Sequence, residues 1–348
     1  MSFSVGIVGL PNVGKSTLFK ALTKKPVDIA AYPFTTIHPN YGVVIVPDEK
    51  LEKIASVIKP EKTTPSIIEF VDIAGLVKGA HKGEGLGNQF LAHIRSCDAI
   101  LEVVRAFEDK DKNVEHVTSE INPESDIETV KVELLMKDIE TLENLIAKLG
   151  KEAKTKDKKT LRKLDLLNKL KDFVSRGKLI SEIDLTEEEK ESIKEHQFLT
   201  LKPIFYILNT NSGPKTLPEK YPSYLAMNLK EEEEISELTE GEIKELGIRS
   251  SLDPLILNCY NILDLITFYT VAGGKEVKAW TLPRGWKTPA AGGKVHSDFE
   301  ERFIKADVIN WEKLVTAGSW KSAREKGWIQ TVGRDYVVQN GDVIEFKI

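Results

Sequence analysis

The chain has 348 residues, of which 41% are hydrophobic and 30% charged, and its formal net charge is −5. This balance is typical of a globular protein of two or three domains, and it excludes a chain that is basic over its whole surface, as a general nucleic-acid coat would be. No stretch reaches the roughly 20 continuous apolar residues of a membrane span, no secretory signal precedes the first expected strand, and Cys97 and Cys259 lie far apart. We therefore expect a cytoplasmic protein with no membrane partner and no disulfide partner.

Four short apolar runs predict buried strands at 4–8, 66–71, 98–104 and 203–208. A segment with helical character follows the first run, and strands that alternate with helices favour a parallel sheet with right-handed crossovers. We predict an α/β domain that is discontinuous in sequence, built from residues 1–122 and 200–263.

Residues 123–199 differ in kind from the two segments around them. Apolar residues recur there at alternating spacings of four and three, which is typical of helices that pack along a shared seam. The first seam is Leu135, Ile139, Leu142, Ile146 and Leu149, and the second is Leu164, Leu167, Leu170 and Val174. Residues 150–160 between the seams are charged and lack this periodicity. We predict an inserted antiparallel helical hairpin with a charged tip.

Short strand-like segments dominate from about residue 264 onward, with one amphipathic helix expected at 297–305. We predict a compact α+β module over 264–348.

Residues 9–16 read GLPNVGKS and match the G-x-x-x-x-G-K-[ST] pattern of a phosphate-binding loop. Gly9 and Gly14 let backbone N–H groups approach phosphate oxygens, and the helix that follows adds partial positive charge. We expect Lys15 to reach the β- and γ-phosphates and to act in catalysis, and Ser16 to ligate Mg²⁺. The other nucleotide contacts expected in this segment are Asn12, Val13, Gly14 and Thr17.

Two further segments predict a switch that responds to the γ-phosphate. The sequence DIAG at 72–75 follows the second expected strand, so Asp72 can hold Mg²⁺ through water and the N–H of Gly75 can bond the γ-phosphate. The loop YPFTTIHPN offers Thr36 as a ligand of Mg²⁺ when the γ-phosphate is present, with Thr35 as the less favoured alternative.

The residue that orients the attacking water is left open. Ras-like enzymes carry a glutamine after the DxxG glycine, and here that position is Leu76, which has no hydrogen-bonding group. His116, His81 and a partner acting in trans are the candidates, and without them intrinsic hydrolysis is expected to be slow. Asn12 is also a candidate to help hold a monovalent cation such as K⁺ against the phosphates.

The expected base pocket differs from that of strict GTPases. The late strand ends in NTNSG at 209–213, so Asn209 is in place, but no acidic residue follows at the spacing of N-K-x-D. A site without that acceptor discriminates guanine weakly. We expect Asn209, Thr210 and Ser212 to contact the nucleotide, in a site that favours ATP or loose specificity over strict use of GTP.

At this point the sequence resembles the YchF family of Obg-related P-loop NTPases, and the resemblance covers nearly the whole chain. The runs that carry it are GLPNVGKSTLF, YPFTTIHPNYGVV, FVDIAGLVKGA, GEGLGNQFL and KEVKAWT…AGGKVHSDFEERFI. The resemblance implies a Ras-like domain, an inserted coiled-coil arm and a C-terminal TGS domain of the β-grasp type. It also implies association with ribosomes and a preference for ATP over GTP.

The resemblance also bears on single residues. The family carries a hydrophobic residue in place of the glutamine, as Leu76 does here, and a histidine that matches His116, which favours His116 over His81. The family's base motif is similar to N-x-x-E, whereas this chain has Ser212 where the glutamate stands. The choice between ATP and GTP therefore stays open.

Residues 151–178 hold eleven Lys and Arg against four Asp and Glu. The lysines at the expected hairpin tip are Lys151, Lys154, Lys156, Lys158 and Lys159. This composition is typical of a solvated loop and also of a protruding hairpin that contacts RNA phosphates. The resemblance favours contact with the ribosome, including its RNA, through this arm and the C-terminal module.

The sequence thus predicts a ribosome-associated P-loop NTPase switch that hydrolyses ATP slowly with Mg²⁺, with GTP as an open second substrate. Two alternatives remain: a nucleotide-dependent binding module with negligible turnover, and a P-loop kinase of a small molecule. The DxxG segment and the Thr36 loop argue against the kinase.

Overall fold

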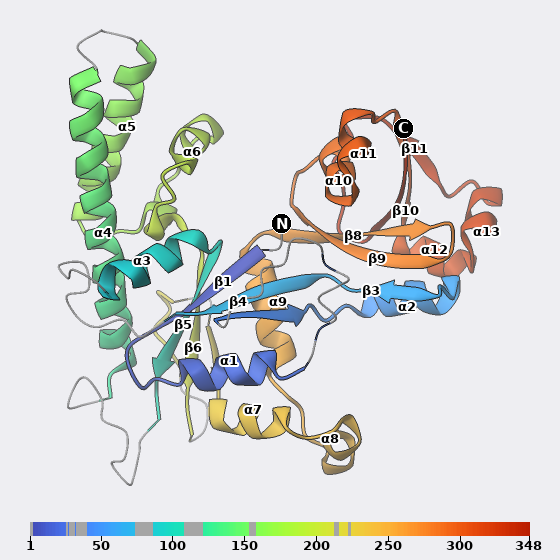
Figure 1. Cartoon of the computed structure of the whole chain (residues 1–348), viewed down its shortest axis with the longest axis horizontal. Coiled ribbons are helices and arrows are strands. Elements are labelled where there is room, and N and C mark those ends of the chain that lie inside the picture. The colour runs from blue at the N-terminus through green and yellow to red at the C-terminus, as the bar shows by residue number, and fades with distance from the viewer. Residues whose placement is uncertain are drawn as a thin grey trace.

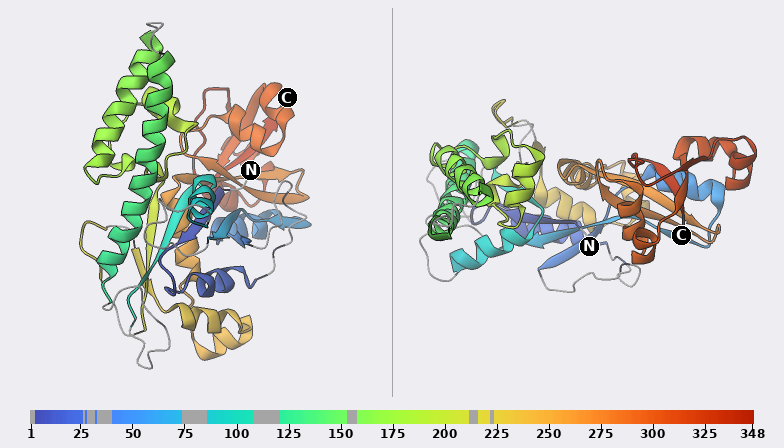
Figure 2. Two further views of the ribbon diagram at one scale, coloured as in Figure 1. Left: turned by 60° about the vertical axis from the view of Figure 1, so that its left-hand side comes forward. Right: turned by 90° about the horizontal axis from the view of Figure 1, so that it is seen from above.

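The computed structural model of the chain describes residues 3–25, 27, 32, 40–73, 86–107, 121–152, 158–211, 216–221 and 224–348. Figure 1 shows an N-terminal α/β unit in the centre, a pair of long helices on one side and a C-terminal α+β unit on the other. Figure 2 shows from a second side that the helical pair extends well beyond the α/β unit. None of the helices in the described ranges combines the length and the hydropathy that a membrane span needs.

Six strands form the sheet of the N-terminal unit. They are β1 (Phe3–Val8), β2 (Tyr41–Ile45), β4 (Ile67–Asp72), β5 (Ala99–Arg105), β6 (Ile204–Asn209) and β7 (Tyr224–Met227). Their order is β2-β4-β1-β5-β6-β7, and every neighbouring pair is parallel except β2 with β4. The four predicted strands are confirmed as β1, β4, β5 and β6, each within one residue at both ends.

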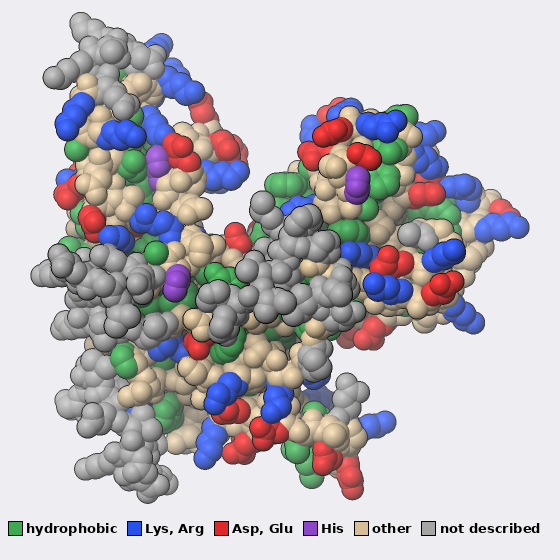
Figure 3. All heavy atoms as spheres, viewed as in Figure 1, with side chains coloured by type: hydrophobic (Ala, Val, Ile, Leu, Met, Phe, Trp, Pro, Cys, Tyr) green, Lys and Arg blue, Asp and Glu red, His purple; other side chains and the backbone are tan. Residues whose placement is uncertain are grey.

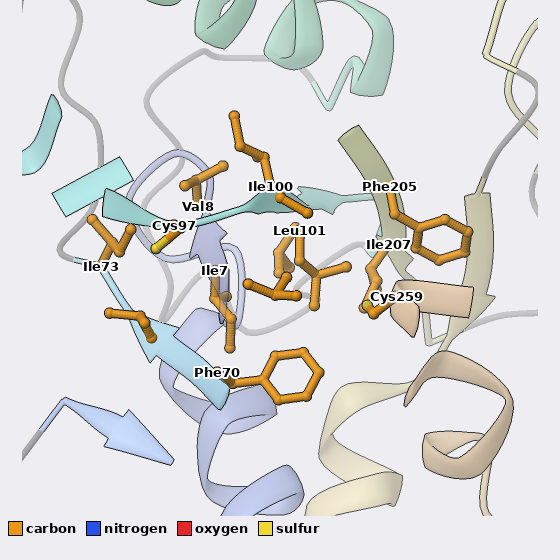
Figure 4. Packing of buried hydrophobic residues seen from close by; sticks show 14 of the residues in the cluster. Ile7, Val8, Phe70, Ile73, Cys97, Ile100, Leu101, Phe205, Ile207 and Cys259 are labelled. Atoms are coloured by element: carbon orange, nitrogen blue, oxygen red, sulfur yellow. The ribbon is translucent and has the colours of Figure 1, made fainter. Parts of the chain in front are cut away.

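Helices cover this sheet on both faces, which is why its central strands read as almost continuous apolar runs. The helices packed on it include α1 (Lys15–Thr23), α3 (Leu86–Ser96) and α9 (Leu252–Ile262), while α7 (Leu229–Ser236) packs against α1 and α8 (Glu240–Leu246) lies farther from the sheet (Figure 1). Ile7, Phe70 and Leu101 are fully buried. Figure 4 shows them on the same side of the sheet, with Val8 and Ile100 on the opposite side. This packing holds the carboxyl ends of β1, β4, β5 and β6 in a fixed relationship.

The predicted helical hairpin is observed as α4 (Pro123–Glu152) and α5 (Lys158–Ser175). The first seam and three residues of the second, Leu167, Leu170 and Val174, pack in one apolar cluster. Leu164 is not part of this cluster, and Leu166, outside the predicted seams, is. A short helix, α6 (Glu187–Lys194), and two 3₁₀ turns at Ile180–Glu182 and Leu199–Leu201 return the chain to the sheet.

The first half of α4 is rooted in the N-terminal unit. Val130 and Leu134 belong to the same apolar cluster as the central strands. Asp138 is fully buried and accepts hydrogen bonds from the N–H groups of Leu199 and Thr200 and from the hydroxyl of Thr200. Arg95 of α3 also donates a hydrogen bond to the hydroxyl of Thr141, so the part of the hairpin beyond Thr141 is the arm that projects from the sheet.

The C-terminal unit contains five strands after residue 264. They are β8 (Leu265–Ala272), β9 (Glu276–Pro283), β10 (Lys305–Asn310), β11 (Gln330–Val332) and β12 (Asp342–Lys347). Strand β12 is antiparallel to β10 and parallel to β8, and β8 forms an antiparallel hairpin with β9. This pattern is that of a β-grasp module, as the resemblance implied.

The helices of this unit differ from the prediction. The single helix expected at 297–305 is wrong in length, because α11 ends at Glu301 and β10 begins at Lys305. Three other short helices were not predicted: α10 (Thr288–Val295), α12 (Trp311–Ala317) and α13 (Trp320–Glu325). Helices of fewer than nine residues offer too few turns for a periodic apolar pattern to stand out.

A segment near the N-terminus completes the C-terminal unit. Between β2 and β4 the chain leaves the first sheet and forms α2 (Glu49–Ile58) and β3 (Lys62–Thr64). Strand β3 joins the second sheet beside β9, so the order there is β11-β10-β12-β8-β9-β3. Leu51 and Ile54 of α2 pack in the same apolar cluster as Tyr269 and Val343. Residues 48–64 thus depart from the predicted division, which assigned all of 1–122 to the α/β domain.

Candidate functional site

The loop between β1 and α1 has a shape that depends on glycine at two positions. Gly9 has a φ of 144° and Gly14 a φ of 106°, in the region that other residues rarely adopt. A Cβ on Gly9 would lie 2.3 Å from the carbonyl oxygen of Val103, and a Cβ on Gly14 would lie 2.6 Å from Nδ2 of Asn209. The loop is therefore held tightly against β5 and β6.

The N-terminus of α1 is suited to an anion. Gly14 precedes the helix, no side chain of the described residues caps its first N–H groups, and no acidic residue lies in its first turn. Unpaired amides and the positive end of the helix dipole stabilise negative charge at such a position. The loop and the helix together therefore offer a geometry and a polarity that suit an anionic group at the carboxyl end of β1.

Lys15 begins α1 and lies against this loop. Its ammonium group donates a hydrogen bond of 2.7 Å to the carbonyl oxygen of Leu10, and only 8% of the residue is exposed. Burial lowers the pKa of Lys15 to about 8, although the carboxylate of Asp72 opposes this effect. Within the described part of the chain this buried ammonium bonds a neutral acceptor, and a charged oxygen is a stronger partner for such a group.

Ser16 and Asp72 bring two oxygen atoms together beside the loop. Asp72 ends β4 and lies next to Ile7 of β1 in the parallel register. The hydroxyl of Ser16 donates to Oδ2 of Asp72 at 3.3 Å. Burial raises the pKa of Asp72, while the Ser16 hydrogen bond and the charge of Lys15 act against that rise. A hydroxyl and a carboxylate are ligands that Mg²⁺ accepts, so this pair fits such an ion.

Asn209 joins three parts of the site. Its Nδ2 donates to the carbonyl oxygen of Val13 at 3.0 Å, and its Oδ1 accepts from the N–H of Leu229 at 3.2 Å. The phosphate loop, the end of β6 and the first residue of α7 are thereby fixed to one another. The N–H of Thr210, the next residue, donates to the carbonyl oxygen of Met227.

The start of α7 is a part of the site that the sequence did not predict. Leu229 is fully buried and its Cδ1 lies 3.1 Å from where a Cβ on Gly14 would be. Asn228 caps the helix by accepting from the N–H groups of Lys230 and Glu231. The signal available in the sequence was the Asn228 cap before an acidic helix start, but nothing local ties it to the loop.

The remaining predicted contacts divide into two groups. Val13 is buried, Asn12 is exposed with a φ of 61°, and Thr17 is half-buried in the first turn of α1. These three residues lie at the carboxyl edge of the sheet together with five other predicted residues: Lys15, Ser16, Asp72, Asn209 and Thr210. Other predicted residues lie outside the described residues: Thr35, Thr36, Gly75, Leu76, His81, His116 and Ser212.

Basic side chains follow the outer part of the arm, as Figure 3 shows on the face it draws. Lys151, Lys158 and Lys159 are exposed there, and Lys154 and Lys156 lie outside the described residues. Three basic residues farther along α5 form ion pairs: Lys163 with Glu195, Lys169 with Glu189, and Lys171 with Glu143. These ion pairs offset positive charge along α5, so the net positive charge of the arm is concentrated toward its tip.

Two family models match the chain. One, described as "50S ribosome-binding GTPase", matches residues 4–137, which include the phosphate loop, Asp72 and the first half of α4. The other, YchF-GTPase_C, described as "Protein of unknown function (DUF933)", matches residues 265–348, the part of the C-terminal unit that begins with β8.

Individual relatives match over their full length. The chain is 45% identical to the "Ribosome-binding ATPase YchF" of Bacillus subtilis over 367 aligned positions, covering 100% of this chain and 99% of that protein. It is 44% identical to the protein of the same name from Escherichia coli O157:H7, covering 99% of each. The solved structure of the Schizosaccharomyces pombe YchF GTPase superposes with a TM-score of 0.85 at 34% identity, covering 99% of this chain and 98% of that one.

Proposed function

Because the chain belongs to the YchF family, we propose that it is a ribosome-associated P-loop ATPase whose ribosome binding changes with its nucleotide state. The observation that supports this proposal most directly is that Lys15, Ser16 and Asp72 lie together beside the start of α1, which no side chain of the described residues caps. The resemblance found in the sequence is confirmed by the full-length relatives, and so is the P-loop fold with its C-terminal domain.

We propose that Lys15 exchanges its hydrogen-bond acceptor when the nucleotide binds. Its ammonium group leaves the carbonyl oxygen of Leu10 and bonds the β- and γ-phosphates, where it meets charged acceptors in place of a neutral one. The N–H groups of the loop and of the first turn of α1 supply the other phosphate contacts. Asn12, Val13, Gly14 and Thr17 line this path.

Ser16 and Asp72 are proposed to hold Mg²⁺, Ser16 directly and Asp72 through water, with Thr36 as a further ligand. Their paired oxygens support this assignment. Bound Mg²⁺ neutralises charge that develops on the phosphates during transfer to water. The N–H of Gly75 and the Thr36 loop are proposed to respond to the γ-phosphate, and Asn12 to help hold K⁺.

The water-orienting group is proposed to be His116. Leu76 offers no donor or acceptor for that role, so a group elsewhere must serve. Intrinsic hydrolysis is then slow, and contact with the ribosome accelerates it. The base is proposed to lie against Asn209, Thr210 and Ser212, with ATP preferred because no carboxylate matches the guanine donors.

We further propose that the exposed lysines of the arm tip and the C-terminal unit make the ribosomal contacts. Phosphate contacts by lysine depend on salt but not on RNA sequence. Such a protein acts where ribosomes work, in the cytoplasm.

Release of phosphate from ATP, measured with and without purified ribosomes, tests this function. We expect slow release alone, faster release with ribosomes, and none from Lys15→Ala. His116→Ala should lower the stimulated rate without weakening ATP binding, and the matched variant His81→Ala should leave both unchanged. Tight ATP binding with no release under either condition would instead identify a pure binding module, and transfer of phosphate to a metabolite would identify a kinase.

A further inference from the structure

The apolar interior of the sheet and that of the arm meet at two successive residues of α4. Leu134 is fully buried in the cluster that contains the central strands, and Leu135 packs in the separate cluster inside the helical hairpin. Farther along α4, Ile139 and Leu142 also pack inside the hairpin. The direction of the arm relative to the sheet therefore depends on the contacts made near this boundary.

Asp138 joins α4 to the segment that leads into β6. Its Oδ1 accepts a hydrogen bond of 2.9 Å from the N–H of Leu199, and its Oδ2 accepts from the N–H and the hydroxyl of Thr200 at 2.8 and 2.7 Å. Burial raises the pKa of Asp138, while the bonds from Thr200 and Leu199 and the charge of Arg95 oppose that rise. A buried acceptor with three donors holds the two segments in one relative position.

Lys202, two residues after Thr200, joins the same segment to the end of α3. Its ammonium group donates to the carbonyl oxygen of Arg95 at 2.9 Å and to that of Cys97. A cation is favourable there, because the last carbonyl groups of a helix carry partial negative charge. The guanidinium group of Arg95 in turn donates to the hydroxyl of Thr141 on α4 at 3.0 Å. These contacts link α3, the segment before β6 and α4 around the root of the arm, where Figure 1 shows α3 beside α4.

A small change at this root is enlarged at the tip. The part of α4 from Asp138 to Glu152 extends about 20 Å, at roughly 1.5 Å per residue. A change of about 10° in direction at Asp138 would therefore move the end of the helix by about 4 Å. That displacement exceeds the length of a hydrogen bond between a lysine and a phosphate oxygen, so it would break such a contact.

We propose that Arg95, Asp138 and Lys202 are positioning residues for the arm, which fix the direction in which its tip lysines project toward the ribosome. They act through the helices of the arm. This proposal rests on the proposed function, because the ribosome is the partner that the arm contacts. It assigns part of the affinity for ribosomes to polar contacts at the root of the arm, away from the basic surface itself.

Distances between two spin labels test the positioning role in the full-length protein. Gly150→Cys at the end of α4 and Lys313→Cys on α12 place the labels at exposed positions on the two parts of the molecule that flank the first sheet. The native residues Cys97 and Cys259 are buried, so the introduced cysteines are the accessible ones among the described residues. We expect a narrow distribution of distances in the protein that carries only the two labels.

Thr141→Val and Lys202→Met each remove one contact at the root. Either change should shift or broaden the distance distribution by about 3–5 Å, from the lever length of α4. Thr141→Ser keeps the hydroxyl that Arg95 bonds and should restore the narrow distribution. Thr129→Val is the matched control, because the hydroxyl of Thr129 bonds the carbonyl oxygen of Ser125 in its own helix.

Sedimentation with purified ribosomes tests the consequence for binding. We expect the Kd for ribosomes to rise about 3- to 10-fold in Thr141→Val and Lys202→Met, because the C-terminal unit still binds while the arm contact weakens. In ribosome-stimulated phosphate release, the ribosome concentration that gives half of the maximal rate should rise, and the maximal rate should stay unchanged. The Kd for the ATP analogue should match the wild type in both variants.

Thermal unfolding shows whether each variant is folded, and Thr200→Val, which removes a bond to Asp138, is a further variant if one of the others is not. Unchanged label distances in folded variants would overturn the positioning role. So would altered distances with unchanged affinity for ribosomes. If the wild type does not bind ribosomes, the proposed function itself fails, whereas the label distances still decide whether these contacts fix the arm.

Discussion

The hydroxyl of Tyr269 lies 2.9 Å from each carboxylate oxygen of Asp48. Tyr269 belongs to β8 of the C-terminal unit, and Asp48 lies between β2 and α2. Oδ1 of Asp48 also accepts from the N–H groups of Lys50 and Leu51, so it caps α2. A single carboxylate therefore fixes the point where the chain crosses from the first sheet to the second.

Removing either partner should destabilise the C-terminal unit by different amounts. Tyr269→Phe loses a hydrogen bond to a charged acceptor, at a cost of about 1–2 kcal/mol in the free energy of unfolding. Asp48→Ala loses the helix cap as well, so about 2–4 kcal/mol is expected. Urea unfolding followed by tryptophan fluorescence measures both. Equal losses would contradict the capping role.

The packing of α2 in the C-terminal unit predicts where a core substitution acts. Ile54 is fully buried against that unit, and Ile54→Ala should cost about 2–5 kcal/mol. Amide exchange should accelerate in β8, β9 and β12. Leu161→Ala on α5 is the control, because 41% of Leu161 is exposed. Faster amide exchange confined to β2 and β4 would instead show that Ile54 stabilises the first sheet and not the C-terminal unit.

This crossing also shows what the sequence could not predict. Strand β3 is three residues long, and its partner β9 lies more than 200 residues away, with Lys62 opposite Glu276. A run of Lys-Thr-Thr carries no apolar alternation, so nothing local marks it as a strand. Long-range contacts assign this segment to the C-terminal unit: the packing of Leu51 and Ile54, the pairing of β3 with β9, and the bond of Asp48 with Tyr269.

Other features were predictable because their signals are local. The phosphate loop needs Gly9, Gly14 and Lys15 at fixed spacing, and the buried strands are apolar on both faces. The arm repeats its apolar seam over several turns, which makes it visible. The contact of Asn209 with Val13 and Leu229 joins three distant segments, so its geometry follows from the fold alone.

The phosphate loop should not tolerate a side chain at Gly14. Gly14→Ala would force a left-handed backbone on alanine and place a Cβ 2.6 Å from Asn209. We expect ATP affinity to fall by at least about tenfold, since strain of about 1–2 kcal/mol adds to displacement of the Asn209 side chain. Gly150→Ala is the control, because no atom of the described residues, apart from its chain neighbours and the backbone of its own helix, lies within 4 Å of its added Cβ. Unchanged binding in Gly14→Ala would contradict the described loop geometry.

Nucleotide affinity should depend on pH through Lys15. Its pKa is lowered to about 8, so above that pH the free site loses the charge that the phosphates need. ATP affinity should then fall by up to about tenfold per pH unit. Titrations between pH 7 and 9.5 measure this slope. The slope should be absent in Lys15→Ala, and a slope that persists there would assign the effect to another group.

The lowered pKa of Lys15 changes the free energy of unfolding with pH in the opposite direction to the ATP affinity. Between about pH 8 and the ordinary value of 10.5, the unfolded chain binds more protons at Lys15 than the folded chain does. The contribution of Lys15 to the free energy of unfolding of the nucleotide-free protein should therefore increase as pH rises through that window. Comparison of wild type with Lys15→Met in urea isolates it, and a contribution that decreases would contradict the burial of the ammonium group.

The central claim is that this site binds ATP through Lys15 and prefers it to GTP. Calorimetric titration of non-hydrolysable Mg²⁺-ATP and Mg²⁺-GTP analogues, with Lys15→Ala as the control, tests it most directly. We predict tight binding of the ATP analogue, weaker binding of the GTP analogue, and loss of both in Lys15→Ala. Equal or tighter binding of the GTP analogue, or binding that survives in Lys15→Ala, would contradict the account.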